Sequence, residues 1–374
     1  MKTTVLQSKL KEGLIIAGKA ISRSVSLPIL KNILIKTEDN FLNISSTDLE
    51  MGIKWWILTK TEKKGEVTVP FSVFSGFVNL LPDKNINIQT KDNNLVLECD
   101  NYKTQINGLS SSDFPIIPDV KKEKVININN KSFCEGLSQI IDIPSPSKMK
   151  PEISGILFLF SGKKLKIVAT DSYRLTEKVI NLKESVKDSF SFIIPQKTAK
   201  EVVNIFKEEE KDIDVVINSN QILFEVKMKE TDHPQVQLFS KLIEGDYPDY
   251  ESIIPSENKT QVVLEKEDFL NKIKAASVFS GRVNEVNLHV NPKKEEVVIT
   301  SESPDLGDYN AVIPANIEGD EVKISFNYKF LSDGLVNIKS SQVLLGFNGE
   351  SNPGVIKPVG KEDFLYVVMP IKNN

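Results

Sequence analysis

The chain has 374 residues, of which 40% are hydrophobic and 26% charged, and its formal net charge is −4. This length exceeds what one hydrophobic core usually holds, so two or three domains are expected. No apolar run reaches the roughly 20 residues that a membrane span needs. Residues 1–6 lack a signal-peptide pattern, so a cytoplasmic protein is expected. The two cysteines, Cys99 and Cys134, have no CxxC partner and are expected to be small buried side chains rather than redox or zinc ligands.

The first third of the chain predicts two helices followed by strands. Leu10, Leu14 and Ala17 recur at helical spacing and predict an amphipathic helix over 7–23. A second helix is expected over 71–81, directly after a strand that ends in Pro70, because proline is well placed beside the first turn of a helix. Alternating or short apolar runs predict strands at 85–89 and 95–97.

The middle third repeats this order. It predicts helices over 131–142 and 195–207, the second again after a strand that ends in proline. Strands are expected at 214–217 and 222–226. Asn204 stands in the same apolar-apolar-Asn-apolar pattern as Asn79, and this recurrence indicates an internal repeat.

The last third contains a third copy. Helices are predicted over 266–282 and 327–339, and Asn337 repeats the pattern of Asn79 and Asn204 at a spacing of about 125 to 135 residues. We therefore expect an α+β protein built from three tandem domains, each with two helices on one side and strands on the other. The expected domain limits are 1–122, 123–250 and 251–374.

The predicted helices are basic, whereas the rest of the chain is acidic. The six helical windows hold 14 Lys/Arg and 7 Asp/Glu, which leaves 33 basic and 44 acidic residues elsewhere. Taken one at a time, these cations are simply solvated helix faces. If the repeats join side by side, however, equivalent helices line one positive surface, which suits sequence-independent binding to the DNA backbone. The candidate DNA-facing residues are Lys9, Lys11, Lys19, Arg23, Lys197, Lys200, Lys207, Lys272, Lys274 and Arg282.

The sequence contains few candidate catalytic or metal-binding residues. His233 and His289 have no Cys or His at ligand spacing, so no metal site is expected. No phosphate-binding loop or nucleophile motif is present, and no cofactor is expected. Asp48, Asp171 and Asp249 could act as acid–base residues but are expected to be turn residues. A non-enzymatic binding protein without catalytic residues is favoured. Two alternatives stay open: a nuclease that uses these acids as metal ligands, and a repeat-built scaffold that never binds DNA.

Five short motifs together carry a family resemblance. They occupy residues 26–34 (SLPILKNIL), 150–158 (KPEISGILF), 168–175 (VATDSYRL), 245–250 (GDYPDY) and 366–371 (YVVMPI). On these motifs the chain resembles, over essentially its full length, the beta subunit of bacterial DNA polymerase III, the beta sliding clamp family. The resemblance implies a processivity factor for DNA replication. It further implies a head-to-tail homodimer that forms a ring of six similar domains around duplex DNA, with helices lining the hole.

The resemblance also implies a hydrophobic cleft between the second and third domains. This cleft would capture short linear motifs of the polymerase III catalytic subunit, the clamp-loader ATPase, and other polymerases and repair proteins. A soft methionine in an apolar floor suits varied peptide side chains. The chain departs from the family pattern at Ser172-Tyr173, at Glu251-Ser252 and in its tail, 372–374. The cleft residues carried over by position are Ile153, Thr170, Tyr173, Arg174, Leu175, Pro248, Ile253, Val367, Val368, Met369, Pro370 and Ile371.

Overall fold

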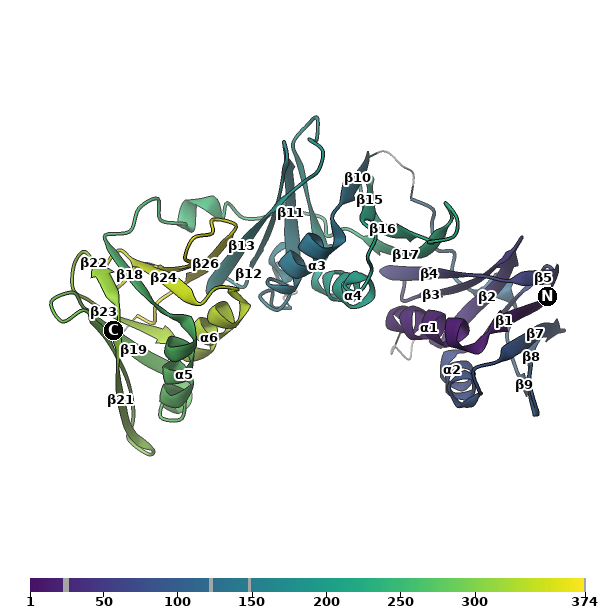
Figure 1. Ribbon diagram of the computed structural model, residues 1–374, viewed down its shortest axis with the longest axis horizontal. Helices are drawn as coiled ribbons and strands as arrows, with labels where there is room; N and C mark the ends of the chain where they lie inside the picture. Colours follow the sequence, from purple (N-terminus) through teal and green to yellow (C-terminus); the bar gives the residue numbers. More distant parts are fainter. Residues whose placement is uncertain (23–26, 121–123, 147–148, 373–374) are drawn as a thin grey trace. The chain divides into compact units, whose positions relative to one another are not determined.

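The computed structural model describes residues 1–22, 27–120, 124–146 and 149–372 (Figure 1). It divides into two compact units. One comprises Met1–Cys134 and Lys200–Leu242, and the other comprises Glu135–Ala199 and Ile243–Asn374. No helix among the described residues is long and apolar enough to cross a bilayer.

The first unit holds two antiparallel sheets. One has the strand order β5-β1-β7-β8-β9, and the other has the order β10-β15-β16-β17-β4-β3-β2-β6. Its elements are β1 (Lys2–Leu6), α1 (Gln7–Ala17), β2 (Asn32–Glu38), β3 (Phe41–Thr47), β4 (Met51–Leu58), β5 (Lys60–Lys63), β6 (Glu66–Pro70), α2 (Phe71–Leu80), β7 (Asn85–Lys91), β8 (Asn94–Cys99), β9 (Tyr102–Ile106), β10 (Lys124–Ile128), β15 (Ile213–Ile217), β16 (Gln221–Lys227) and β17 (Pro234–Lys241).

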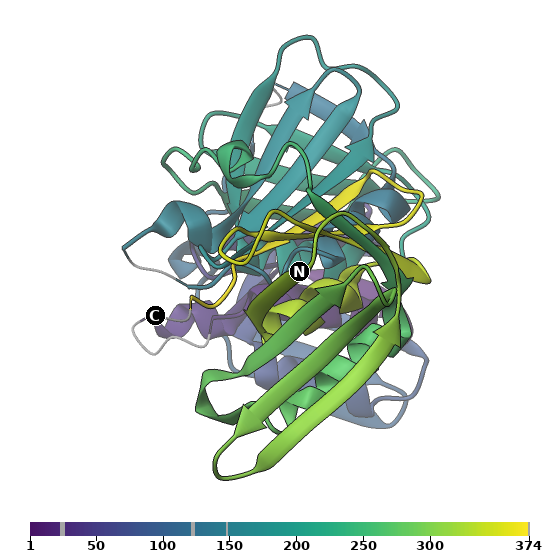
Figure 2. The same ribbon diagram turned by 90° about the vertical axis from the view of Figure 1, so that its left-hand side faces the viewer.

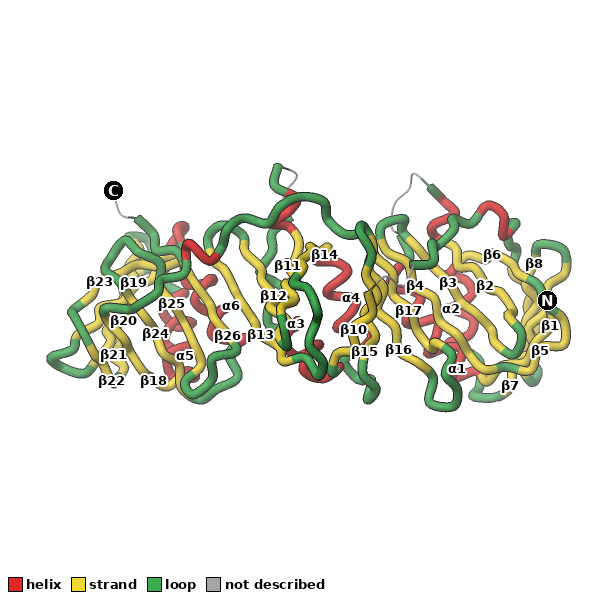
Figure 3. Tube along the Cα trace, turned by 90° about the horizontal axis from the view of Figure 1, so that it is seen from above, coloured by secondary structure: helices red, strands yellow, loops and turns green. Residues whose placement is uncertain are grey.

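Helix α1 shows how the repeat buries its helices. Leu10, Leu14 and Ala17 are buried on the side of α1 that faces β3 and β4. Gly13 allows a close approach, because a Cβ added there would lie 2.6 Å from Cδ1 of Trp55 on β4. Helices α1 and α2 also pack against each other (Figure 3). The apolar stripe predicted for this helix is therefore the stripe that packs on the sheet.

The second unit also holds two antiparallel sheets. Their orders are β14-β11-β12-β13-β26-β25-β24-β18-β22 and β21-β20-β19-β23. Helices α5 and α6 pack against each other and against strands of both sheets (Figure 2). The elements are β11 (Gly155–Ser161), β12 (Lys164–Thr170), β13 (Arg174–Asn181), β14 (Phe190–Pro195), β18 (Thr260–Glu265), α5 (Lys266–Ser277), β19 (Glu285–Asn291), β20 (Glu296–Ser303), β21 (Gly307–Pro314), β22 (Asn316–Glu318), β23 (Val322–Asn327), α6 (Tyr328–Asn337), β24 (Gln342–Phe347), β25 (Gly354–Pro358) and β26 (Phe364–Val368).

Two further helices, α3 (Asn130–Ser138) and α4 (Gln196–Phe206), begin in one unit and end in the other. Their ends are tied by side chains. Asn130 donates to the Phe206 carbonyl at 2.6 Å, and Gln196 donates to the Ile141 carbonyl at 2.7 Å. These two bonds join the start of each helix to the end of the other, so α3 and α4 are an antiparallel pair.

The same order of elements occurs three times, which confirms three tandem α+β domains. Each repeat has a strand, a helix, a run of strands, a second helix and three final strands. In every repeat the first strand pairs with the strand after the second helix: β1 with β7, β10 with β15, and β18 with β24. The repeated pairing shows that the degenerate sequence repeat encodes one topology.

The helices differ from expectation mainly in length. The helix predicted over 7–23 ends at Ala17 and continues as a 3₁₀ turn, Gly18–Ala20, and the helix predicted over 266–282 ends at Ser277. At the first of these ends the Ile21 N–H donates to the Gly18 carbonyl at 3.3 Å, an i→i−3 bond that tightens the chain into the 3₁₀ turn. Apolar residues continue past both ends, so hydrophobic spacing alone predicted helices that were too long.

Successive repeats join through their strands. The third strand after the first helix of one repeat pairs with the last strand of the next repeat. In the first unit this joins β4 to β17, and in the second it joins β13 to β26. Both pairs are antiparallel and span five residue pairs, so each junction is a continuous sheet.

Candidate DNA-binding and peptide-binding sites

The candidate cations on α1 lie on its outer side. Lys9 and Lys11 are exposed, and Lys9 forms an ion pair with Glu12 at 3.2 Å. Lys19 is half-buried, with its ammonium 3.6 Å from the Glu201 carboxylate of α4. Arg23 lies outside the described residues. The first helix therefore presents two lysines to solvent.

Helices α4 and α5 carry the remaining candidates. On α4, Lys197 is exposed and Lys200 is half-buried; Lys207, directly after α4, is exposed and lies 3.7 Å from Glu208. On α5, Lys272 bonds to Asp268 at 2.5 Å and Lys274 is exposed. Arg282 is exposed on the 3₁₀ turn Gly281–Val283 that follows. Six of the nine described candidates are thus exposed on the helices or directly after them.

The candidate cleft is built around the tight turn between β12 and β13. The Thr170 hydroxyl donates to the Arg174 carbonyl at 2.8 Å, which closes the turn. The Asp171 carboxylate accepts from the backbone N–H groups of Tyr173 and Arg174, both at 3.0 Å. Ser172 has a φ of 77°, in the left-handed region. Asp171 is therefore a turn residue, as predicted.

Arg174 connects this turn to helix α6. Its guanidinium bonds to Asp171 at 3.0 Å and also to the Asp333 carboxylate. The guanidinium carbon lies 4.8 Å from the centre of the Phe330 ring, and Tyr173 stacks on the same ring with centroids 6.0 Å apart. Asp333 and Phe330 were not predicted as site residues, because nothing in the local pattern of α6 links them to a turn more than 150 residues earlier.

Below the turn lies a buried apolar cluster, defined by Leu157, Val168, Leu175, Ile193, Tyr250 and Val367. Leu175 pairs with Val367 across β13 and β26, and Arg174 pairs with Val368. These apolar side chains are almost fully buried. They support the site from beneath and leave little surface for a ligand.

The link after the second repeat is anchored in this cluster by Tyr250. The Tyr250 hydroxyl donates to Glu177 at 2.7 Å. Burial, and next the hydrogen bond to Glu177, raises the pKa of Tyr250, so the phenol stays protonated. Lys166 lies 3.4 Å from Glu177 and 3.0 Å from Glu251, which adds an ionic tie between link and sheet. The link therefore has a fixed path beside the candidate cleft.

The structure brings only part of the candidate set into direct contact. Thr170 and Arg174 are joined within the turn, and the Met369 N–H donates to the Tyr173 carbonyl at 2.8 Å. Tyr173 and Ile253 are exposed, whereas Ile153 is buried. Pro248 is exposed, and Met369, Pro370 and Ile371 are half-buried. The surface open to a ligand is therefore the set Tyr173, Pro248, Ile253, Met369, Pro370 and Ile371.

Two of the three aspartates considered as acid–base residues, Asp48 and Asp171, have structural roles. Asp48 accepts from the N–H groups of Glu50 and Met51 at 3.0 and 2.7 Å. Like Asp171, it is a turn residue. Across the described ranges no group of three or more His, Cys, Asp or Glu is arranged to hold a metal ion.

Comparison with known proteins covers nearly the whole chain. Three family models match in order: DNA polymerase III beta subunit, N-terminal domain, over residues 1–118; central domain, over 127–249; and C-terminal domain, over 251–372.

Curated relatives and solved structures agree with these models. The beta sliding clamp of Bacillus subtilis is 28% identical over 384 residues and is covered completely, as is this chain. That of Staphylococcus aureus is 28% identical, with 95% of this chain and 94% of the relative covered. The crystal structure of the Bacillus subtilis DNA polymerase sliding clamp matches with a TM-score of 0.94 at 27% identity, over 100% of each chain.

Proposed function

The chain belongs to the family of the DNA polymerase III beta subunit, the beta sliding clamp, and we propose that it serves DNA replication as a ring-shaped processivity factor. In this role it encircles duplex DNA without reading the base sequence and tethers the replicative polymerase to the template. The observation that carries the proposal is the way strands pair between successive repeats.

Two junctions between repeats lie within the chain, and a third is left open. The third strand of the last repeat, β21, and the last strand of the first repeat, β9, are both edge strands of their sheets in the described part of the chain. An unpaired edge presents backbone groups that another chain can bind. By analogy with β4–β17 and β13–β26, we expect β21 of one copy to pair with β9 of a second. The same pairing at the other end closes a head-to-tail homodimer, a ring of six domains.

The basic helix faces supply the contact with DNA. We propose that three groups of cations face the DNA backbone: Lys9 and Lys11 on α1; Lys197, Lys200 and Lys207 on and after α4; and Lys272, Lys274 and Arg282 on and after α5. Contacts to phosphate are independent of base sequence and are weakened by salt. A closed ring stays on DNA by topology, so these contacts can be weak enough to permit sliding.

The exposed surface around the β12–β13 turn supplies the contact with partners. We propose that the twelve cleft residues form a site for short linear motifs of the polymerase III catalytic subunit, the clamp-loader ATPase, and other polymerases and repair proteins, in which the six exposed or half-buried residues named above contact the ligand and the others support them. Met369 and Ile253 offer apolar surface, and the link held by Tyr250 gives one wall a fixed position. Tyr173 on its Phe330 support offers an aromatic face, at a position where the family pattern has a different residue.

The proposal includes no catalytic step, metal or cofactor, and it places the protein in the cytoplasm with the replication machinery. The proposed domain limits are 1–122, 123–250 and 251–374.

Retention on DNA tests this function. The labelled chain is loaded by a clamp-loader ATPase onto nicked circular DNA, and gel filtration follows before and after the circle is cut once. Retention on circles and loss after cutting, at the same salt concentration, is expected for a topological link. Loss from intact circles, or equal retention on cut DNA, would overturn the proposal.

A further inference from the structure

The chain contains two Asn-Gly pairs, Asn107-Gly108 and Asn348-Gly349. In such a pair the glycine nitrogen can attack the side-chain amide carbon of the asparagine, because a residue without a Cβ leaves that nitrogen accessible. A carbon–nitrogen bond forms, a succinimide ring closes and ammonia leaves. Water then opens the ring to aspartate or to isoaspartate, in which the main chain runs through the side chain and is longer by a methylene. In a folded protein the reaction requires an asparagine side chain that is able to turn.

The side chain of Asn348 is held in place. Its Oδ1 accepts from the Lys259 N–H at 2.8 Å, and its Nδ2 donates to the Glu257 carbonyl at 2.8 Å. The Asn348 carbonyl also accepts from the Asn352 side chain at 2.7 Å. Attack by the Gly349 nitrogen would require both side-chain bonds of Asn348 to break, so this pair is protected in the folded protein.

Asn107 is not held in this way. It is exposed directly after β9, and within the described ranges neither its side-chain amide nor the Gly108 N–H has a hydrogen-bond partner. The two reacting groups are therefore available without breaking a hydrogen bond. The glycine is required by packing, since a Cβ at Gly108 would overlap the carbonyl oxygens of Asn93 and Thr68.

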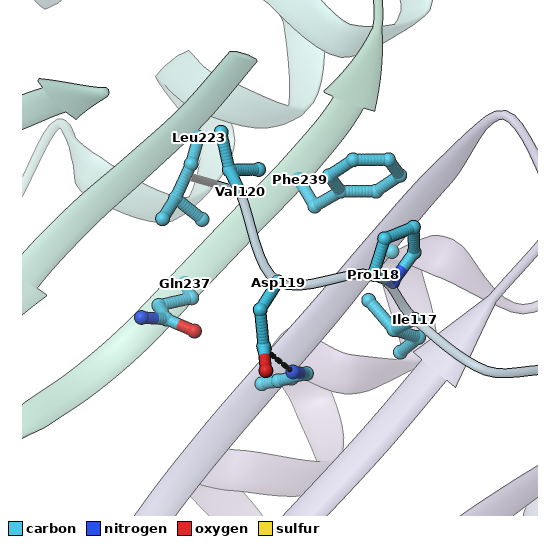
Figure 4. A pocket seen from close by; sticks show the side chains of 9 residues that line it. Ile117, Pro118, Asp119, Val120, Leu223, Gln237 and Phe239 are labelled. Carbon is cyan, nitrogen blue, oxygen red and sulfur yellow. Dashed lines mark hydrogen bonds and ion pairs between the residues drawn. The ribbon is translucent and has the colours of Figure 1, made fainter. Parts of the chain in front are cut away.

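Asn107 is the first residue of the link between β9 and β10, and the rest of this link is anchored. The Leu109 N–H donates to the Thr68 carbonyl at 2.8 Å. Further along, Ile117 packs against the buried cluster that includes Phe239 (Figure 4). Because the link is fixed so soon after Asn107, a longer main chain at this position has to be taken up by the end of β9.

The position of Asn107 has an equivalent at the first junction between repeats. Leu109 and Ile243 each form an isolated bridge after the last strand of their repeat, so Asn107 corresponds to Lys241. The Lys241 N–H donates to the Glu50 carbonyl at 3.0 Å, in the turn that precedes β4. In the proposed ring β9 takes the part of β17. The Asn107 N–H is therefore expected to bond to the turn before β21 of the second copy.

We propose that Asn107 deamidates spontaneously in the folded protein and that this modification weakens ring closure as the protein ages. Isoaspartate formed from Asn107 lengthens the main chain where β9 is expected to bond to the second copy, and it adds a carboxylate at the end of that strand. The effect on ring closure rests on the proposed function, whereas the reaction itself does not depend on it.

Peptide mapping by mass spectrometry tests the reaction, with the full chain aged at mildly alkaline pH in buffer and in urea. In the native protein Asn107 is expected to react more than about tenfold faster than Asn348, because two hydrogen bonds must break at Asn348. In urea the two are expected to react at similar rates, because unfolding removes this protection. Equal rates in the native protein, or an Asn107 that reacts only after unfolding, would overturn the modification site.

Light scattering of the aged chain tests the effect on ring closure. Loss of one backbone hydrogen bond is expected to raise the dissociation constant of the dimer about fivefold for each junction affected. The matched control is Asn107→Gln, because glutamine keeps the amide but reacts far more slowly through a larger ring, so this variant should keep its dissociation constant.

Two results would contradict this part of the proposal and separate it from the proposed function. An unchanged dissociation constant after conversion of Asn107 would overturn the effect on ring closure and leave the ring intact. A fresh chain that is already monomeric would overturn the ring itself, while the rates at Asn107 and Asn348 still judge the modification site.

Discussion

Replacing Arg174 by alanine is expected to destabilise the second unit strongly. The side chains of Arg174 and Asp171 are only 10% and 9% exposed, so the substitution leaves a buried carboxylate without its cation. Breaking such a buried pair costs about 3–5 kcal/mol. Asp171 keeps its two backbone N–H donors, which favours the lower end, and loss of the contact with Phe330 adds about 0.5–1 kcal/mol. A total of about 3.5–4 kcal/mol follows.

Asp333 provides the matched comparison. Its side chain is 54% exposed, so Asp333→Asn, which removes only one of the two ion pairs that Arg174→Ala removes, is expected to cost less than about 1 kcal/mol. The difference between the two variants isolates the buried half of the Arg174 network.

Urea unfolding gives the assay, because both tryptophans of the chain, Trp55 and Trp56, lie in the first unit. Circular dichroism follows both units, whereas tryptophan fluorescence follows the first. In Arg174→Ala the dichroism signal should begin to fall at lower urea, and the tryptophan midpoint should move less. Equal costs for Arg174→Ala and Asp333→Asn, or a shift confined to the tryptophan signal, would show that the buried Arg174–Asp171 pair does not stabilise the second unit.

Three further outcomes are expected. Gly13→Ala should destabilise the protein by about 1–3 kcal/mol, because the added Cβ would collide with Trp55. Gly76→Ala, on the open surface of α2, should instead stabilise it by about 0.5–1 kcal/mol. The two variants should therefore shift the Tm in opposite directions, and shifts of the same sign would contradict this. Burial raises the pKa of Cys134 to about 12, so it should stay unmodified by a thiol reagent at pH 8 until the protein is unfolded; rapid labelling of the native protein would contradict this. Burial, and next the charge of Glu12, raises the pKa of Glu209, so stability should fall as pH rises above the ordinary value of 4.5. Glu209→Gln should remove this loss, and a benefit that does not grow between pH 4.5 and 7.5 would argue against it.

The sequence was informative where structure follows from local pattern. The spacing of Leu10, Leu14 and Ala17 predicted the buried face of α1, and the recurrence of Asn79, Asn204 and Asn337 predicted three domains. The first signal arises within about two turns of one helix, where periodicity and burial are tightly linked. The second compares short local patterns at three places along the chain.

Contacts between distant segments could not be read in the same way. Nothing local to β4 indicates that it pairs with β17, which lies about 180 residues further on. The placement of Asp333 and Phe330 against Arg174 depends on the fold of a whole repeat. Leu175 and Val367 are likewise buried because β13 pairs with β26. The twelve cleft residues were assigned by their positions in the sequence, so they include buried supporting residues as well as exposed contact residues.

The closed ring is tested most directly by the solution mass, measured by light scattering across a dilution series. A dimer of about twice 41.9 kDa is expected, because two copies must pair β21 with β9 to close the ring. Val312→Glu on β21 should shift the chain toward monomer, whereas Val125→Glu on β10 should not; the two valines are 46% and 52% exposed. A chain that stays at 41.9 kDa at every concentration would contradict the closed ring.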